Sequence, residues 1–287
     1  MFRFGYADSP HGQVHHASAG AGSPLLLLPG STRSFRQFRA LVPLLAPHHR
    51  VVAVDTLGYG ASAPFPAGGT METLAESAVS VLDALDIARA DVFGMHTGHK
   101  VAAVLAAHWP GRVRRLVLAG KTHSIIPDQD LRNRAILAQI KGRTTLPANG
   151  AARPLLDPLA WGRAFRSVSS LAWNDALLTG ATHDLILAVR DKMADELLSL
   201  EDTGAIYAAN FAFDFAQAVR EVRARTLVLE VTSDAEDRAW GRQGEALARL
   251  LADGKVATLP AVDDVGLACV ADTAALCEAV LAFLRED

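Results

Sequence analysis

The residue of greatest chemical interest in this chain is a histidine in the stretch FGMHTGH. His96 stands two residues after Gly94 and two residues before Gly98. A sharp strand-to-helix turn of the G-x-Ser-x-G type needs small residues at these two positions, and its tip usually carries a serine nucleophile. A frame centred on Thr97 would put a methionine and a histidine at the small positions. The spacing therefore predicts that His96 is the residue at the tip of such a turn.

A histidine at this tip supports more than one chemistry. The imidazole can act as a general base on water or on a substrate proton. It can also act as a covalent nucleophile. A neighbouring carboxylate would fix the tautomer of the ring and stabilise its protonated form. The alternative is that His96 replaces a catalytic residue in a protein that only binds a ligand.

The overall composition predicts a folded protein that does not bind polyanions. The chain has 287 residues, of which 50% are hydrophobic, enough for one α/β domain with an inserted subdomain. The formal net charge of -3 makes nucleic acid and anionic membranes poor partners. No signal peptide and no membrane-spanning apolar run are visible, which predicts a cytoplasmic protein. Cys269 and Cys277 form no metal motif and are expected to fill the core.

Six short apolar runs predict the strands of a mostly parallel sheet. Their continuous Val and Leu content suits strands that are buried on both faces. Two earlier pieces, FRFGYA and QVHHASA, alternate more clearly and predict a leading antiparallel hairpin. The six runs are Pro24–Gly30, Arg50–Asp55, Ala90–Gly94, Arg114–Gly120, Arg225–Val231 and Lys255–Pro260.

Helical patterns separate these strands, with apolar residues three and four positions apart. The alternation of strand and helix predicts an α/β fold with helices on both faces of the sheet. The helical segments are Met71–Leu85, Lys100–His108, Ala239–Leu251 and Thr273–Leu284.

The alternation stops between about residues 123 and 222, where several helical patterns follow one another. This segment is too long for one connection. It predicts an inserted helical cap at residues 123–222, over a core domain made of residues 1–122 and 223–287.

Aromatic residues in the insertion, taken as a group, predict a hydrophobic substrate pocket. For any single one of them, packing of the cap on the sheet is the better explanation. Phe211 and Phe215 are four residues apart, and within one helix they would share a face. The candidate substrate contacts in the insertion are Trp161, Phe165, Phe211 and Phe215.

Five segments, in order along the chain, resemble the α/β-hydrolase family. The resemblance covers nearly the whole length and implies that family's fold, although a fold alone does not determine function. The segments are PLLLLPGSTRSFRQF, VVAVDTLGYGAS, VFGMHTGHKVAAVLAAHWPGRVRRLVLAG, TLVLEVTSD and ADTAALCEAVLAFL.

The resemblance implies a nucleophile, an acid and a histidine in that chain order. Asp234 stands where the acid is expected. No histidine follows His183, so a Ser-Asp-His triad in its usual order cannot form. Asp263 and Asp264 lie near the place of the missing histidine, and Asp264 is the preferred partner of His96. The two would form a His-Asp dyad inverted in chain position, with Asp234 as the alternative orienting acid.

The resemblance also implies an oxyanion hole built from backbone N–H groups. Thr97, just after the tip, and Ser31, just after Gly30, are the two candidate donors. Pro29 replaces the usual histidine of the first loop. His123 follows the fourth buried run, near the sheet edge where ligands bind in open α/β sheets. It is a candidate polar contact for the substrate, with simple surface exposure as the alternative.

The sequence predicts neither a metal nor a cofactor. The adjacent pairs His15–His16 and His48–His49 lack the i,i+4 spacing of a zinc motif. Neither a Walker loop nor a dinucleotide fingerprint follows a strand. His96 with two carboxylates could bind a divalent ion, and this stays an alternative.

We therefore expect a hydrolase of a small neutral or apolar ester, lactone or related carbonyl compound, using His96 and an aspartate partner. A cofactor-free lyase or isomerase with His96 as general base is one alternative, and a non-catalytic ligand-binding protein is another. The absence of an aspartate at the tip counts against dehalogenase and epoxide chemistry. The expected partner is a small molecule. The sequence leaves the oligomeric state open, with a homodimer as one option.

Overall fold

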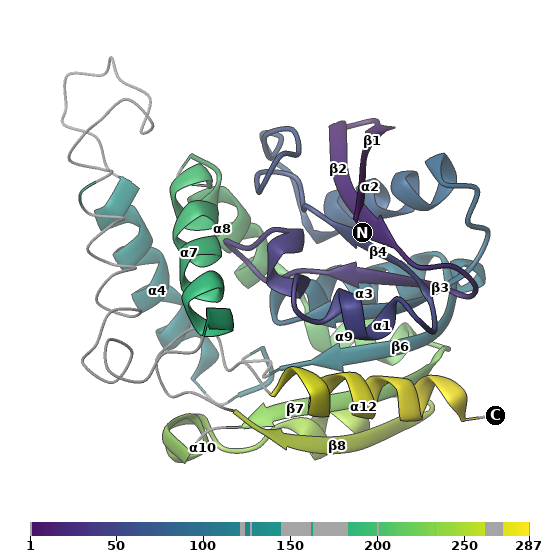
Figure 1. Ribbon diagram of the computed structural model, residues 1–287. Coiled ribbons are helices and arrows are strands. Elements are labelled where there is room, and N and C mark those ends of the chain that lie inside the picture. Colours follow the sequence, from purple (N-terminus) through teal and green to yellow (C-terminus); the bar gives the residue numbers. More distant parts are fainter. Residues whose placement is uncertain are drawn as a thin grey trace.

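An eight-stranded sheet forms the centre of the molecule (Figure 1). The computed structural model describes residues 2–120, 124–126, 128–144, 162, 183–199, 201–232, 234–261 and 272–286. The first two strands form the expected antiparallel hairpin, and the next six confirm the six apolar runs. The strands are β1 (Arg3–Ser9), β2 (Gly12–Ala19), β3 (Pro24–Leu28), β4 (Arg50–Val54), β5 (Ala90–Met95), β6 (Val113–Ala119), β7 (Arg225–Thr232) and β8 (Gly254–Pro260).

The strand order reverses between β3 and β5. The order across the sheet is β1-β2-β4-β3-β5-β6-β7-β8, and every pair from β4 to β8 is parallel. The chain therefore moves outward from β3 to β4, then returns to the other side of β3 as β5. Ligands in open α/β sheets bind at the carboxyl ends of the strands where the order reverses. In this sheet that point lies between the ends of β3 and β5.

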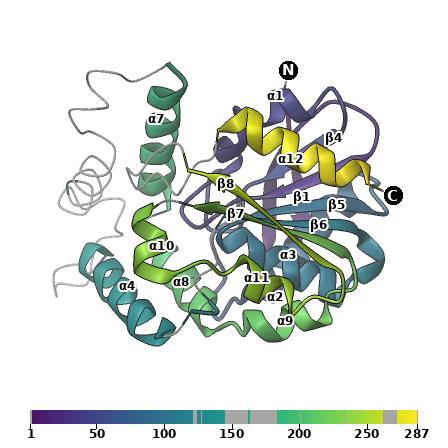
Figure 2. The same cartoon turned by 90° about the horizontal axis from the view of Figure 1, so that it is seen from below.

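Alternate strand residues bury two separate cores, one on each face of the sheet. Leu26 and Val92 belong to the core under α2 (Met71–Ala84), α3 (Thr97–His108) and α9 (Phe215–Glu221). Leu25 and Phe93 belong to the core under 3-10 helix η1 (Phe35–Phe38), α1 (Val42–Leu45) and α12 (Thr273–Arg285). Figure 2 shows the sheet between these two helical layers, which confirms the expected α/β fold.

Three described helices from the segment between β6 and β7 lie beside the sheet, where the carboxyl end of β6 leads into α4 (Figures 1 and 2). They are α4 (Gln129–Thr144), α7 (His183–Leu198) and α8 (Thr203–Ala212). α4 packs on α8, and α7 packs on η1. The next helix, α9, packs on α3 in the sheet's own helical layer.

The prediction of a single helix across Phe211 and Phe215 is wrong, because α8 ends just before Phe213 and a new helix begins at Phe215. Phe213 is extended, with ψ 129°, and the side chain of Asp214 accepts a hydrogen bond from the Gln217 N–H to start α9. An aspartate offers the backbone this N-cap in place of helix continuation. Phe211 and Phe215 therefore lie on different helices and do not share a face.

The helix expected over Ala239–Leu251 is also divided. The structure has α10 (Asp234–Trp240) and the short α11 (Gly244–Ala248) instead. Gly241 lies between them with φ +69°, a conformation that ends a helix readily. A short 3-10 helix, η2 (Pro110–Arg112), joins α3 to β6.

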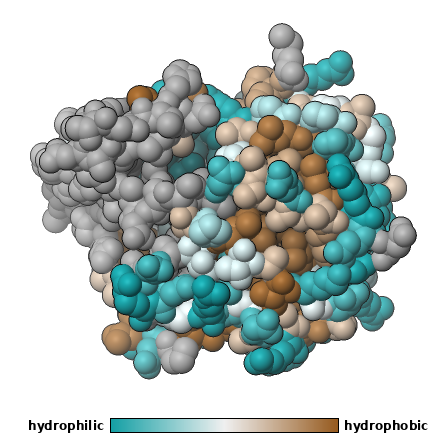
Figure 3. All heavy atoms as spheres, turned by 60° about the horizontal axis from the view of Figure 1, so that its bottom comes forward, coloured by the Kyte–Doolittle hydropathy of each residue, from teal (hydrophilic) through white to brown (hydrophobic). Residues whose placement is uncertain are grey.

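The edge strand β8 and its surroundings form one outer face of the molecule. Its residues are half-buried or exposed throughout. In Figure 3, apolar atoms on this side gather in a group that polar atoms surround. Cys277, on α12 nearby, is buried in the core as expected.

Candidate active site at the turn between β5 and α3

His96 is the one residue between the end of β5 and the start of α3. Its backbone has φ 48° and ψ -113°, a combination that non-glycine residues rarely adopt. Its N–H donates to the carbonyl of Ala119 on β6 at 3.1 Å, and its carbonyl accepts from the His99 N–H at 2.8 Å. Strain of this kind costs about 1–3 kcal/mol and persists only where its surroundings enforce it. The turn predicted from the spacing is therefore present, with His96 at its tip.

Close backbone packing explains why glycines flank this turn. A Cβ on Gly94 would lie 2.3 Å from the Gly98 carbonyl oxygen, and a Cβ on Gly98 would lie 2.2 Å from the Leu28 carbonyl oxygen. A Cβ on Gly120, at the end of β6, would lie 2.8 Å from Cε1 of His96. The imidazole thus rests against the bare backbone of Gly120.

Ser31 and Thr97 meet at the point where the strand order reverses. Ser31 follows β3, Thr97 begins α3, and their hydroxyl oxygens are 2.6 Å apart. Both residues are half-buried. The loop after β3 has Pro29 where the family usually has a histidine. The turn of this loop is held instead by the side-chain oxygen of Gln37, which accepts a hydrogen bond from the Gly30 N–H at 2.9 Å. Ser31 and Thr97, the residues expected to supply the oxyanion donors, are thus in contact through their side-chain hydroxyls.

Two charged or titratable residues of α3 are buried behind the turn. His99 is 1% exposed, and its Nε2 hydrogen-bonds to the Ala119 carbonyl. Burial lowers the pKa of His99 to about 3, and the nearby His96 adds to this lowering. Lys100 donates from Nζ to the main-chain oxygen of Asn210 on α8. Burial lowers the pKa of Lys100 to about 7. These contacts assign both residues a structural role in the described part of the chain.

Asn210 completes the link between α8 and the turn. Its side-chain nitrogen donates to the Thr97 hydroxyl at 3.3 Å, and the residue is 6% exposed. Asn210 was not among the site residues predicted from the sequence. The signal was present as a single amide in the apolar helical stretch AIYAANFAF, but nothing local indicated what it would contact.

The structure brings only some of the predicted site residues together. Asp234 is exposed at the start of α10, just beyond the carboxyl end of β7. Phe211 is half-buried on α8, edge-on to Tyr207 with ring centroids 5.6 Å apart. Phe215 is 1% exposed and stacks against His99 at 6.4 Å, so it belongs to the core. Five other candidates, Asp263, Asp264, His123, Trp161 and Phe165, lie outside the described residues.

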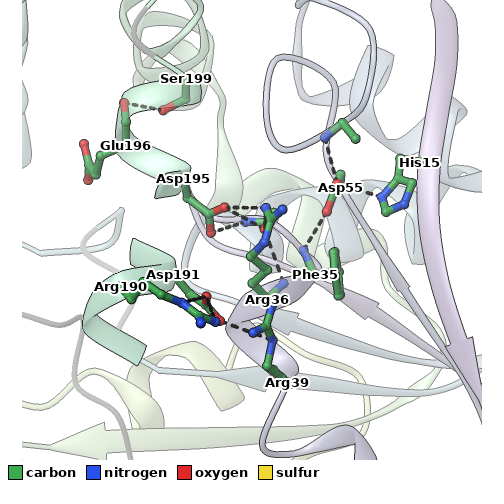
Figure 4. Close-up of polar contacts among 12 residues, drawn as sticks. His15, Phe35, Arg36, Arg39, Asp55, Arg190, Asp191, Asp195, Glu196 and Ser199 are labelled. Carbon is green, nitrogen blue, oxygen red and sulfur yellow. Dashed lines mark hydrogen bonds and ion pairs between the residues drawn. The ribbon is translucent and has the colours of Figure 1, made fainter. Parts of the chain in front are cut away.

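An ionic network holds α7 against the loop that follows β3 (Figure 4). Asp195 accepts from the hydroxyl and main-chain N–H of Ser34, and pairs with Arg36 at 3.2 Å. Asp191 pairs with Arg39, also at 3.2 Å. Figure 4 shows both aspartates of α7 directed at the arginines of the loop. The network fixes the segment that carries Ser31.

A second buried carboxylate holds the neighbouring loop. Asp55, at the end of β4, accepts from the Phe35 N–H at 2.6 Å and from the Ala61 N–H at 2.9 Å. It also contacts Nδ1 of His15 at 2.8 Å (Figure 4). Asp55 therefore holds its loop through these three contacts.

In the described parts of the chain, no three His, Cys, Asp or Glu side chains cluster as metal ligands would. No described helix is both long and apolar enough to cross a bilayer.

Comparison with known proteins decides the family. A family model for the alpha/beta hydrolase fold matches residues 23–180, more than half of the chain. The chain belongs to this family. It is also similar to the 2-hydroxymuconate semialdehyde hydrolase of Pseudomonas sp. strain CF600, with 41% identity over 113 residues. That match covers 38% of this chain and 40% of the relative, so it spans less than half of either protein.

Solved structures match this alpha/beta hydrolase over almost its whole length. A hydrolase from Pseudomonas aeruginosa PA01 superposes with a TM-score of 0.73 and 26% identity, covering 99% of each chain. The enol-lactonase of Burkholderia xenovorans LB400 superposes with a TM-score of 0.72 at 22% identity, covering 98% of this chain and all of the other. The second likeness is one of fold alone.

Proposed function

We propose that this alpha/beta hydrolase cleaves a small ester, lactone or related carbonyl compound with His96 in place of a serine. The observation that carries the proposal is the strained backbone of His96 at the turn between β5 and α3, with φ 48°. Strained non-glycine residues cluster at functional sites. The crowded backbone around Gly94 and Gly98 holds this conformation, and the turn carries the His96 side chain at its tip.

The reaction follows from the groups around the turn. The substrate carbonyl oxygen lies between the backbone N–H groups of Ser31 and Thr97, which stabilise the negative charge that develops on it. His96 acts as general base: it takes a proton from water as the water oxygen attacks the carbonyl carbon. The protonated imidazole then returns this proton to the departing alkoxide as the ester bond breaks. The products are a carboxylic acid and an alcohol. Alternatively, an imidazole nitrogen attacks the carbonyl carbon, the ester C–O bond breaks, and the alkoxide leaves with the proton of the ring. Water then cleaves the acyl–nitrogen bond, which releases the carboxylic acid and restores the imidazole.

A carboxylate is proposed to orient His96 in either route. Asp264 is the preferred candidate, with Asp263 and Asp234 as alternatives. Such a partner fixes the ring tautomer and stabilises the imidazolium that forms. Asp234 stands after β7, at the sheet edge that also carries His96.

The segment 123–222 is proposed to act as a cap that selects the substrate. His123, Trp161, Phe165 and Phe211 are its proposed contacts, while Phe215 would act from the core behind them. The contact of α7 with the Ser31 loop supports a cap that adjoins the site. The relative from Pseudomonas sp. strain CF600 is named for hydrolysis of a small carbonyl compound, which favours this substrate class.

The test is turnover of short-chain 4-nitrophenyl esters and simple lactones by the wild type and by His96→Ala. His108→Ala is the matched control, because His108 is an exposed histidine at the other end of the same helix. We expect activity in the wild type and the control and none above background in His96→Ala. Equal activity in all three proteins would remove His96 from the mechanism. No activity in any of them would refute hydrolysis of this substrate class.

A further inference from the structure

Asn210 on α8 is hydrogen-bonded to two residues on one face of α3. Lys100 Nζ donates to its main-chain oxygen, and its own side-chain nitrogen donates to Thr97. Thr97 and Lys100 are three residues apart, so they lie on the same side of the helix. The backbone and the side chain of Asn210 are thus both fixed against the helix that begins at His96.

The position of the Asn210 amide is costly. Its side-chain oxygen is buried and has no hydrogen-bond partner among the described residues. An unsatisfied buried acceptor is unfavourable, and each such group in a native structure calls for an explanation. Directing the amide nitrogen at Thr97 supplies that explanation.

The hydrogen bond from the Asn210 amide determines which of the Thr97 and Ser31 hydroxyls donates to the other. Because Thr97 Oγ1 accepts from Asn210, its own proton is available for Ser31, 2.6 Å away. Ser31 Oγ then accepts from Thr97, and its proton must point elsewhere. Ser31 is half-buried beside the proposed oxyanion site, so a bound carbonyl oxygen can compete with the Tyr59 hydroxyl for this proton.

We propose that Asn210 is a positioning residue that orients the hydroxyls of Thr97 and Ser31, so that Ser31 donates a hydrogen bond from its side chain to the substrate oxyanion. This inference rests on the proposed hydrolytic function and assigns α8 a part in it. Tyr59 is the competing acceptor for the Ser31 proton. Burial raises the pKa of the Tyr59 hydroxyl, and its interaction with the Ser31 side chain acts in the opposite direction.

The first test compares Asn210→Asp and Asn210→Leu with the wild type on 4-nitrophenyl acetate. In Asn210→Asp the carboxylate accepts the Thr97 proton. Thr97 Oγ1 then accepts a hydrogen bond from the Ser31 hydroxyl, so the Ser31 proton points to Thr97 and away from the substrate. Leucine removes the donor without adding charge. Loss of one oxyanion donor typically costs about 100- to 1000-fold in kcat. We expect kcat to fall at least about 10-fold in Asn210→Asp and less in Asn210→Leu, with KM little changed. Gln217→Ala is the control, because Gln217 is an exposed amide that bonds only locally, to Glu221 at 2.8 Å.

The decisive step repeats Asn210→Asp in a Ser31→Ala background. If Asn210 acts through Ser31, the aspartate should cause little further loss there, because linked residues are not additive. A charge effect or a packing defect would lower kcat by the same factor in both backgrounds, and that result would overturn the proposal. So would unchanged kcat in Asn210→Asp. Tyr59→Phe should keep or raise kcat, since it removes the competing acceptor.

A binding measurement separates this inference from the proposed hydrolysis. Phenylphosphonate carries oxygens that stand in for the oxyanion, and calorimetry measures its Kd without turnover. We expect Asn210→Leu to weaken phenylphosphonate about 10-fold and Gln217→Ala to leave it unchanged, in line with one lost charge-assisted hydrogen bond. An Asn210-dependent Kd without esterase activity would refute hydrolysis and keep the positioning role. Equal Kd values in wild type and Asn210→Leu, or no binding by the wild type, would refute the positioning role.

Discussion

The carboxylate of Asp195 accepts two hydrogen bonds from Ser34, one from the hydroxyl at 2.7 Å and one from the main-chain N–H at 3.0 Å. This contact joins residues 161 positions apart and fixes α7 on the loop after β3. Asp195→Ala would leave the buried Ser34 groups without an acceptor. We expect a loss of about 1–3 kcal/mol in the free energy of unfolding, measured by urea titration.

Asp83→Ala provides the comparison for this loss. Asp83 pairs with Arg112 at 2.7 Å, but its side chain is 62% exposed. Exposed ion pairs contribute about 0–1 kcal/mol. If the two variants lose the same stability, the Asp195 network does not hold α7 in place.

Gly98 offers a test of the turn itself. A Cβ there would lie 2.2 Å from the main-chain oxygen of Leu28, which cannot move without displacing β3. Gly98→Ala is therefore expected to destabilise the protein by about 1–3 kcal/mol or more and to abolish any activity that depends on His96. Gly111→Ala is the control, because a Cβ on Gly111 meets no atom within 4 Å. Thermal unfolding of both variants measures the difference, and a stable Gly98→Ala protein would contradict the close packing of β3 on α3.

The sheet could be predicted from the sequence because its signals are local. Runs such as Pro24–Leu28 are apolar without interruption, and the strands inside the parallel sheet, unlike the edge strand β8, are largely buried on both faces. The turn at His96 could be predicted equally well, because its crowded backbone requires glycine at positions 94 and 98, and both glycines are visible in the sequence.

Contacts between distant segments could not be predicted in this way. Asp195 is one of several acids in α7, and nothing near it in sequence shows that Ser34 is its partner. The Asn210–Thr97 contact spans 113 residues and depends on how α8 is placed against α3. The break before α9 was missed for a different reason: the apolar periodicity across Phe211 and Phe215 outweighed the capping signal of Asp214.

His99 predicts a loss of stability in acid. Its pKa is lowered from 6.5 to about 3 in the native state, so below pH 6.5 the unfolded chain binds a proton that the native state does not. Stability should therefore fall as the pH drops from 6.5 toward 3, by about 1.4 kcal/mol per pH unit from this group. His99→Phe keeps a ring against Phe215 and cannot titrate. The difference in unfolding free energy between the two proteins should change with this slope, and a constant difference would show that His99 is protonated in the native state.

Lys100 predicts the complementary effect in base. Its pKa is lowered from 10.5 to about 7, so between these values the unfolded chain holds a proton that the native state has released. Stability should rise with pH across this window, again by about 1.4 kcal/mol per pH unit. Lys100→Met keeps the apolar stem without the charge, and its stability should lack this rise. Parallel curves for wild type and variant, measured by urea titration from pH 7 to 10, would contradict a neutral Lys100.

A serine introduced at position 96, the tip of the turn, should not produce a serine hydrolase. In His96→Ser the new hydroxyl would need a general base, and the chain contains no histidine after His183 to supply one. His99 is the nearby alternative, but its Nε2 is bonded to the Ala119 carbonyl, and burial holds its pKa near 3. We therefore expect His96→Ser to hydrolyse 4-nitrophenyl esters no faster than His96→Ala and to resist phenylmethylsulfonyl fluoride. Turnover above that of His96→Ala together with sensitivity to this reagent would show that a base does reach position 96. That base would then be the group that orients His96 in the wild type.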